Sequence, residues 1–297
     1  MNTNLQANSE PLVTIGLPTY NRPDGLQKCL EYICKQTYTN LEIIISDNCS
    51  TDERVQQIIK AFTLKDSRIR ALRQPVNAGL EENFNIVFAN ATANYFIWMS
   101  DDDYFDDNYV AACVQFLEKN PDHVLCSGVA RYYADDKFIF TEKMFLTDQR
   151  TAFGRMYHYF SKVNKNGNFY GVFRNRLLLE KPIGLHIGCD WSFMAKLAVL
   201  GKLGYVETTC YHRSADGNSG TKRKMIKKFG FNKWKSVFFE TYVAYYVAAN
   251  IFNDRTVKNK FNLFQKKLIE CVIFFQMNIK SVVQFINKKR GKNYFKA

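Results

Sequence analysis

Over its first 130 residues the chain alternates between two patterns of hydrophobic and polar positions. Short apolar runs, such as LEIIIS at 41–46, predict buried strands, while Leu26, Leu30 and Ile33 recur at the spacing of a helix in 23–36. Strands that alternate with helices of roughly a dozen residues predict βαβ units and a mostly parallel α/β sheet. The expected strands are 12–17, 41–46, 68–74 (at an edge), 95–99 and 123–133, and the expected helices are 23–36, 53–62, 80–93 and 106–120.

Polar residues follow three of these predicted strands. The first strand runs into 18–22 (PTYNR), the second into Asp47 and Asn48, and the strand at 95–99 into 101–103 (DDD). In open α/β sheets, ligands bind beyond the carboxyl ends of the strands. The sequence therefore predicts that these polar groups meet at one edge of the sheet and form a binding site there.

The three adjacent acids in YFIWMSDDDYFDD, at 95–107, are the clearest candidates for chemistry. Clustered carboxylates supply the hard oxygen ligands that Mg²⁺ and Mn²⁺ prefer. The alternative is a solvated acidic turn that precedes the next helix. Their position after the most apolar strand favours a ligand site for Asp101, Asp102 and Asp103, whereas Asp106 and Asp107 are expected only to start the next helix.

The pattern is harder to interpret between 134 and 220. Asp190 begins an amphipathic helix, and GYVETTCYH at 204–212 predicts a strand. The segment 213–224 is rich in glycine and serine, which indicates a mobile loop. Residues 225–290 then show a helical, basic and aromatic pattern.

The charge of the chain is concentrated in its last quarter. The whole chain of 297 residues has a net charge of +13, and 46% of it is hydrophobic, which is enough for a substantial core. Residues 221–297 carry 18 Lys and Arg against 3 acidic residues, while 1–220 carry 23 basic and 25 acidic residues. This asymmetry predicts two parts, a domain over 1–220 and a basic helical extension over 221–297.

The cysteines and the apolar stretches indicate where in the cell the protein is expected. Eight cysteines include no CxxC pair, so we expect neither a zinc site nor a dense disulfide framework but small hydrophobic residues in a reducing cytosol. The N-terminus lacks the apolar core of a signal peptide, and no apolar stretch approaches the roughly 18–20 residues of a membrane span. We expect a cytoplasmic protein, either soluble or peripheral at the inner face of the cell membrane.

Four motifs stand in order along the chain: TIGLPTYNRPDGLQKCL, LEIIISDNCSTD, NAGLEENFN and YFIWMSDDDYFDD. In order and spacing they resemble glycosyltransferase family 2, the inverting enzymes of the GT-A fold, strongly over residues 11–135 and weakly over 165–215. The resemblance implies a GT-A fold, a nucleotide-sugar donor, expected to be a UDP-sugar, and Mn²⁺ or Mg²⁺ as cofactor. It also implies a hydroxyl acceptor on a glycan or a lipid-linked oligosaccharide, in surface polysaccharide biosynthesis.

The resemblance also assigns the donor site. Asp47 resembles the acid that accepts a hydrogen bond from uracil, although it could equally cap a helix as an Asx turn. Many family members carry an aspartate where this chain has Ser100, which leaves open which two acids of the triplet act. In the resemblance, Pro18, Thr19, Tyr20, Asn21 and Arg22 hold the nucleotide base, Asp101 faces the ribose, Asp102 binds the metal, and Asp103 supports it or binds the metal as well.

The remaining candidates lie in the second half of the domain. Asp190 resembles the catalytic base, although the family pattern usually has an acid one position earlier, where this chain has Cys189, and a helix N-cap is the alternative. His212 or Arg213 would contact the diphosphate beneath a closing lid, or else they form an ordinary strand end. Arg174 and Arg176 are weaker candidates for contacts with the acceptor or a phosphate.

Three interpretations of the extension stay open. The favoured one is a peripheral membrane surface with basic residues near anionic lipid and Trp234, Phe238 and Phe239 in the interface, because many related enzymes act on lipid-linked glycans. Plain solvated helical packing is the second. Nucleic-acid binding is the third, and it is not expected because no motif of that class occurs.

Two other functions are alternatives to sugar transfer. A nucleotidyltransferase would carry a basic glycine-rich loop near its first strand, where this chain has PTYNRPDG. A non-catalytic nucleotide-sugar-binding or scaffold protein of a glycan assembly complex is the alternative that the sequence leaves open.

Overall fold

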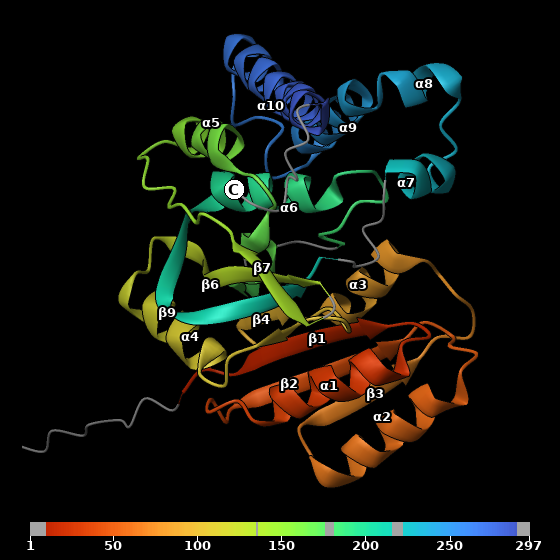
Figure 1. The fold of residues 1–297 in the computed structure, drawn as a ribbon. Coiled ribbons are helices and arrows are strands. Elements are labelled where there is room, and N and C mark those ends of the chain that lie inside the picture. Colours follow the sequence, from red (N-terminus) through yellow and green to blue (C-terminus); the bar gives the residue numbers. More distant parts are fainter. Residues whose placement is uncertain (1–9, 135, 176–180, 216–221, 290–297) are drawn as a thin grey trace, which may run out of the picture.

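A central sheet of mixed direction carries the rest of the molecule (Figure 1). The computed structural model describes residues 10–134, 136–175, 181–215 and 222–289. Within these residues nine strands form the sheet, in the order β3-β2-β1-β4-β8-β6-β9-β5, with β7 paired to β6. The strands are β1 (Val13–Thr19), β2 (Leu41–Asp47), β3 (Ile69–Arg73), β4 (Tyr95–Trp98), β5 (Tyr104–Phe105), β6 (His123–Ala134), β7 (Lys137–Thr141), β8 (Val172–Arg174) and β9 (Lys202–Ser214).

Helices cover both faces of this sheet, and a further group of helices stacks on one side, at the top of Figure 1. That upper group comprises the helices of the basic extension. The helices are α1 (Pro23–Cys34), α2 (Glu53–Lys65), α3 (Leu80–Ala89), α4 (Tyr109–Lys119), α5 (Ala152–Lys162), the 3₁₀ turn η1 (Gly167–Tyr170), α6 (Cys189–Leu200), α7 (Lys222–Lys228), α8 (Lys233–Val237), α9 (Phe239–Asn253) and α10 (Leu263–Lys289).

The predicted first half of the fold is confirmed. β1 pairs in parallel with β2 on one side and with β4 on the other, and β3 lies at the edge, parallel to β2. Because these strands run the same way, their carboxyl ends lie at one edge, where Thr19 is level with Asp47. The α/β fold class expected from the sequence is therefore the observed one.

The second half of the sheet contains strands that the sequence pattern did not predict. β8 is only three residues long and is inserted antiparallel between β4 and β6, and the two-residue β5 pairs antiparallel with β9. Runs this short carry no measurable periodicity, so only tertiary pairing defines them. β6 and β9 are long and parallel to each other, with two register shifts.

Among the described residues, the two larger hydrophobic cores lie on opposite faces of the sheet. Side chains alternate between them along each strand, so that Ile97 points into the core under α1, α2 and α4, and Phe96 and Trp98 point into the core under α3, α5 and α6. Strands buried on both faces account for the continuous apolar runs in the sequence. All eight cysteines are free thiols, and four of them are buried in or beside these cores.

The helices of the extension belong to the second of these cores. Val247 and Ile251 of α9 and Ile269 of α10 are fully buried in the same apolar cluster as Trp98. The expected boundary between 220 and 221 falls within 216–221, outside the described residues, so the division into two parts stays a prediction. Among the described helices, none is both long enough and apolar enough to span a bilayer.

One expected surface aromatic is buried instead. Phe239, predicted for a membrane interface, is 8% exposed and packs in the core at the start of α9, so that prediction was wrong. Its neighbours Trp234 and Phe238 are 72% and 54% exposed, as expected. Adjacent residues on a helical turn face different directions, and the sequence pattern did not show which of Phe238 and Phe239 faces the core.

The start of α1 packs against the backbone of the acid triplet. A Cβ atom on Gly25 would lie 2.2 Å from the carbonyl oxygen of Asp101, closer than any side chain can approach. Gly25 therefore allows α1 to sit directly against the segment that carries the three carboxylates.

We expect Gly25→Ala to push α1 away from Asp101. Overpacking of this kind costs about 1–3 kcal/mol in the free energy of unfolding. Urea unfolding measures the effect. Gln27→Ala, an exposed position on the same helix, is the control. Equal stability for the Gly25 variant and the control would contradict the prediction.

Candidate active site

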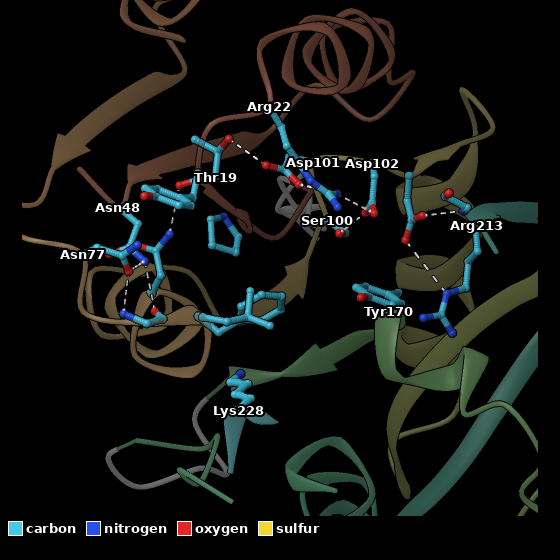
Figure 2. A pocket seen from close by; sticks show the side chains of 18 residues that line it. Thr19, Arg22, Asn48, Asn77, Ser100, Asp101, Asp102, Tyr170, Arg213 and Lys228 are labelled. Carbon is cyan, nitrogen blue, oxygen red and sulfur yellow. Dashed lines mark hydrogen bonds and ion pairs between the residues drawn. The ribbon is translucent and has the colours of Figure 1, made fainter. Parts of the chain in front are cut away.

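A cavity of about 410 Å³ opens at the carboxyl ends of β1 and β4 (Figure 2). Its walls come from the loop after β1, the start of α3, the acid triplet, the end of β9 and α7. These segments are far apart in the sequence and meet here because the parallel strands end at the same edge. The residues that line it are Pro18, Thr19, Tyr20, Arg22, Asn48, Asn77, Gly79, Leu80, Asn83, Phe84, Ser100, Asp101, Asp102, Asp103, Tyr170, Arg213, Ser214 and Lys228.

Asp101 and Asp102 share one cationic partner. The Arg22 guanidinium lies 3.3 Å from Asp101 Oδ1 and 2.6 Å from Asp102 Oδ2. Thr19 also donates its hydroxyl hydrogen bond to Asp101 Oδ2 at 2.7 Å, and Ser100 donates to Asp102. Two residues of the PTYNR motif are thus tied directly to the acid triplet, as their shared edge predicted.

Asp103 is held from the opposite wall. Its Oδ1 accepts a hydrogen bond from the backbone N–H of Ser214 at 2.8 Å, and Arg213 Nε lies 3.9 Å from its Oδ2. Both partners come from the end of β9. The triplet therefore connects the loop after β1 with the last residues of the sheet.

Burial shifts the acid–base behaviour of two of these acids. It raises the pKa of Asp101 to about 6, although Thr19 and Arg22 favour the ionised form. Burial and the neighbouring charge of Asp102 raise the pKa of Asp103 to about 7, against the effect of Arg213. A positive charge placed beside these carboxylates would favour their ionised forms.

The expected base-binding residues separate into two groups. Pro18, Thr19, Tyr20 and Arg22 line the cavity, with the Tyr20 ring 40% exposed. Asn21 does not line it: its φ is +50°, and its side-chain oxygen accepts hydrogen bonds from the backbone N–H groups of residues 51 and 52. Asn21 thus fastens the loop after β1 to the start of α2.

Asp47 is fully buried behind the cavity wall. Its carboxylate accepts hydrogen bonds from the Ser50 backbone N–H at 3.0 Å and from the Gln56 side chain, and it pairs with Arg73 at 3.1 Å. It is not among the cavity-lining residues. The contact with uracil expected for Asp47 therefore stays a prediction.

Sequence reasoning assigned no role to an asparagine cluster that lines the cavity. Asn48 donates to Asn77 Oδ1 at 3.0 Å and accepts from the Ala78 backbone N–H, which shapes the turn before α3. Asn83 bridges β1 and β2 by donating to the carbonyls of Thr19, at 3.4 Å, and Ser46, at 3.0 Å. The motif NAGLEENFN contains two of these residues and was the available signal.

His212 and Arg213 point to opposite sides of β9. His212 lies between Asp106, 2.8 Å from Nε2, and the Tyr133 hydroxyl, and it stacks on Tyr104 away from the cavity. Arg213 faces the cavity, with its guanidinium 4.9 Å from the centre of the Tyr170 ring. Strand alternation explains why two adjacent residues divide in this way.

Asp106 has a tertiary role that the sequence did not reveal. α4 begins only at Tyr109, so the prediction that Asp106 and Asp107 start this helix was wrong. Asp106 instead accepts hydrogen bonds from His212 and, at 2.7 Å, from the Cys210 backbone N–H. It fixes the end of β9 that carries Arg213.

Of the two arginines considered for contacts with the acceptor or a phosphate, Arg174 has a structural role in this fold. Arg174 donates to three acceptors beside the sheet, including the Tyr95 hydroxyl at 2.6 Å, and it does not line the cavity. Arg176 lies outside the described residues.

A second cavity, of about 430 Å³, adjoins the first and contains Asp190. Its walls are mainly apolar and come from α6, α7, α9 and α10, and it shares Leu80, Phe84, Tyr170, Arg213 and Lys228 with the first cavity. Burial raises the pKa of Asp190, against the hydrogen bond from Asn166 Nδ2 at 2.9 Å. Gly188 is the N-cap residue of α6, so Asp190 is free of that role.

The first cavity contains carboxylates that could bind a metal ion but not, within the part of the chain that the structure describes, a full set of protein ligands for one. Among the described residues no group of three or more His, Cys, Asp or Glu side chains is arranged to hold a metal ion. Asp102 and Asp103 nevertheless offer adjacent carboxylates at the cavity wall, and Mg²⁺ typically takes one or two carboxylates with the remaining ligands from phosphate and water. The donor set is compatible with such an ion.

The protein has an α/β fold with an acidic cavity at the carboxyl edge of its sheet, where ligands bind in open α/β folds. The family model described as glycosyl transferase family 2 matches residues 14–202, which is more than half of the chain. The chain belongs to this family and is a glycosyltransferase.

Two curated relatives illustrate the range of the family. The chain is 23% identical to glycosyltransferase GlyG of Streptococcus pneumoniae over 270 residues, covering 88% of this chain and 81% of GlyG. It is 30% identical over 148 residues to WfaP of Escherichia coli, a UDP-Glc:alpha-D-GlcNAc-diphosphoundecaprenol beta-1,3-glucosyltransferase, covering 50% of this chain and 56% of WfaP. Several other relatives are much longer, and the match spans 12% to 22% of their length.

Solved structures confirm the GT-A fold. The TarS fragment 1–349 of S. aureus in complex with UDP-GlcNAc aligns with a TM-score of 0.64 at 16% identity, covering 90% of this chain and 72% of that one. Mannosyltransferase PcManGT of Pyrobaculum calidifontis, in complex with GDP-Man and Mn²⁺, aligns with a TM-score of 0.60 at 16% identity, covering 91% and 70%. At this identity the likeness concerns the fold.

His186 in the second cavity gives a pH-dependent prediction. Burial and, to a lesser extent, the charge of Lys196 lower the pKa of His186 from 6.5 to about 4, and its Nε2 lies 2.9 Å from Ser192 Oγ. Below about pH 6.5, His186 binds a proton in the unfolded chain but stays neutral in the folded chain until the pH approaches 4. The free energy of unfolding therefore decreases as the pH falls from about 6.5 to about 4.

We expect His186→Gln to reduce this loss. Between about pH 7.5 and pH 4.5, the variant should lose roughly 2–3 kcal/mol less unfolding free energy than the unsubstituted protein, as measured by urea unfolding at each pH. Parallel pH profiles for the two proteins would show that His186 is not held neutral in the fold.

Proposed function

We propose that this glycosyltransferase moves a sugar, with inversion, from a UDP-sugar to a hydroxyl group of a glycan or lipid-linked acceptor in surface polysaccharide biosynthesis. One observation carries the proposal: the acidic cavity at the sheet edge adjoins a more apolar cavity that contains Asp190, and the two share five lining residues. A donor in the first cavity and an acceptor in the second would meet at that shared wall.

The donor is assigned to the first cavity because of its size and its polar lining. Tyr20 offers a half-exposed ring for a base, and the asparagines 48, 77 and 83 offer amide groups for a nucleoside. Arg213 and Lys228 supply positive charge that suits a diphosphate. The UDP-GlcNAc complex of TarS and the UDP-Glc named for WfaP support uridine as the base, with Asp47 as its expected partner.

Asp190 would act as the catalytic base. An incoming hydroxyl must lose its proton as it attacks the anomeric carbon from the side opposite the leaving diphosphate. A carboxylate with a raised pKa is a stronger base than an ordinary one, and desolvation raises the pKa of the half-buried Asp190. The proton would pass to its carboxylate, and the surrounding apolar wall excludes competing water.

Asp102 and Asp103 would hold the metal ion. Mn²⁺ or Mg²⁺ bound there supplies a Lewis acid that offsets the negative charge of the departing nucleoside diphosphate. Asp101 is already committed to Thr19 and Arg22 and would position the ribose. The Mn²⁺ in the PcManGT complex supports a divalent ion.

We expect Asp190→Asn to abolish transfer while leaving donor binding intact. Hydrolysis of UDP-glucose, UDP-galactose, UDP-N-acetylglucosamine and GDP-mannose with Mn²⁺ should identify the donor, and the variant should then lose about 10²–10⁴-fold in rate, because the general base is gone. Thermal stabilisation by UDP should be retained. Asp102→Asn should instead lose the additional stabilisation that Mn²⁺ gives with UDP.

Two results would count against this function. Full activity of Asp190→Asn would remove it as the base. Absence of any Mn²⁺-dependent hydrolysis by the unsubstituted protein, together with normal UDP binding, would favour the non-catalytic scaffold.

A peripheral location at an anionic membrane surface is part of the proposal. Trp234, Val237 and Phe238 are exposed on and just after α8, within residues 221–297, which carry 18 basic and 3 acidic residues. Aromatic side chains next to lysines suit the interface of an anionic bilayer. This surface would bring the enzyme to a lipid-linked acceptor on the cytoplasmic side.

Vesicle binding by the full chain tests this location. We expect co-sedimentation with phosphatidylglycerol vesicles but not with phosphatidylcholine vesicles, and a several-fold loss of binding for Trp234→Ser combined with Phe238→Ser. Point substitutions are needed because the extension forms part of the core. Leu64→Ser, at an equally exposed position on α2, is the control. Unchanged binding by the double variant would exclude this surface.

A further inference from the structure

The turn before η1 places one side chain directly against Asp190. Asn166 is 1% exposed, and its Nδ2 donates a hydrogen bond to Asp190 Oδ2 at 2.9 Å. Its φ is +60°, in the left-handed region that asparagine adopts more readily than most residues. The backbone of the turn and the side chain therefore both suit an asparagine at this position.

The orientation of this amide is fixed from its other end. Tyr159 of α5 is fully buried, and its hydroxyl donates a hydrogen bond to Asn166 Oδ1 at 2.8 Å. With its oxygen engaged by a donor, the amide presents its NH₂ group to Asp190. Tyr159 thus determines that Asp190 meets a hydrogen-bond donor rather than an acceptor.

A buried carboxylate clamps the backbone on both sides of Asn166. Glu142 is 4% exposed, and its two oxygens accept hydrogen bonds from the backbone N–H groups of Lys165, at 2.8 Å, and Gly167, at 3.0 Å. A Cβ atom on Gly167 would lie 2.5 Å from Glu142 Oε2, so glycine permits this close contact. The turn cannot shift without breaking charge-assisted hydrogen bonds.

The same clamp reaches the arginine shared by the two cavities. The Tyr132 hydroxyl donates to Glu142 Oε2 at 3.0 Å and accepts from Arg213 Nη1 at 2.9 Å. One carboxylate therefore holds both the turn that carries Asn166 and, through Tyr132, the guanidinium that lines the donor cavity. The placement of Asp190 and of Arg213 depends on a common anchor.

We propose that Asn166 is a positioning residue for catalysis, whose amide, fixed by Tyr159 and the Glu142 clamp, orients Asp190 and keeps it ionised at neutral pH. The proposal rests on the function proposed above, in which Asp190 is the base. A donor to a carboxylate favours its charged form, and this donor opposes the effect of burial on Asp190. Without this donor, the pKa of Asp190 would rise further, because desolvation would be opposed less.

Other titratable groups around Asp190 act on it more weakly or from a greater distance than this hydrogen bond. Arg213 favours its ionised form, while burial disfavours it. The groups that face Asp190 or line its cavity are Arg213 from β9, Tyr159 from α5, Tyr170 from η1, Cys189 from α6, Glu81 from α3, Lys228 from α7, and His186 from the segment before α6. None of them changes in the variants below except Tyr159.

The experiment is the pH dependence of kcat/KM for hydrolysis of UDP-glucose or UDP-N-acetylglucosamine with Mn²⁺, whichever the unsubstituted protein cleaves faster. Asn166→Gly removes the amide and keeps a residue that tolerates the left-handed backbone. Asn168→Ala is the matched control, because Asn168 is also 1% exposed and lies on the same turn, with no hydrogen bond to Asp190.

We expect the acidic limb of the profile to move upward by about one to two pH units in Asn166→Gly, since a hydrogen bond to a charged group contributes about 1.5–3 kcal/mol. The loss of activity should therefore shrink as the pH rises. Tyr159→Phe should move the limb in the same direction by less. Asn168→Ala should leave its position unchanged even if the melting temperature falls.

Two outcomes overturn the proposal. A loss of activity in Asn166→Gly that is the same at every pH would mean a merely structural role, as would an equal shift in Asn168→Ala. If Asn166→Gly does not fold, an acidic limb of the pH profile that stays at the same pH in Tyr159→Phe would overturn the proposal.

A second measurement separates this proposal from the proposed function. Infrared difference spectra between the unsubstituted protein and Asp190→Asn report the protonation of Asp190 without turnover. Full activity of Asp190→Asn would overturn the proposed base and this inference together. If Asp190→Asn is inactive but Asn166→Gly leaves the titration of the Asp190 carboxyl group unchanged, this inference alone would be overturned.

Discussion

Burial of Asp101 and Asp103, two of the three adjacent carboxylates that follow β4, is the constraint on which the site depends. Desolvation of Asp101 and Asp103 is unfavourable, and their raised pKa values record it. Compensation comes from the loop after β1 through Thr19 and Arg22, and from the end of β9 through Ser214 and Arg213. These partners lie more than 75 residues away on either side in the sequence, so satisfying the acids fixes both walls of the cavity at once.

The same constraint explains why the two halves of the chain form one site. The loop after β1 supplies one wall of the first cavity, whereas Arg213 and Tyr170 belong to both cavities. The basic extension also contributes, because Lys228 lines both cavities and pairs with Glu81 of α3 at 2.6 Å. α9 packs against the α6 core that presents Asp190. The asymmetry of charge predicted a basic extension after residue 220, and the described helices of that segment pack around the second cavity and share its core.

The sequence predicted those features that local patterns determine. Continuous apolar runs identified β1, β2 and β4, and parallel strands then required their polar ends to converge, which brought Thr19, Arg22 and Asp101 to Asp103 together. Features defined by pairing between distant segments were missed: the short strands β5 and β8, the role of Asp106 under β9, and the burial of Phe239. Asn166 was missed for the same reason, since an asparagine in a turn has no periodic signal and its partner is 24 residues away.

The acids of the two cavities are compensated in different ways, and the difference matches their proposed tasks. Arg22 forms ion pairs with Asp101 and Asp102, and such contacts suit carboxylates that must stay charged to bind a cation and a ribose. Asp190 receives its side-chain hydrogen bond from a neutral amide. A cation at that distance would lower the basicity of Asp190. A neutral side-chain donor favours the ionised form less strongly than a cation would, so the carboxylate keeps a raised pKa and remains able to take a proton.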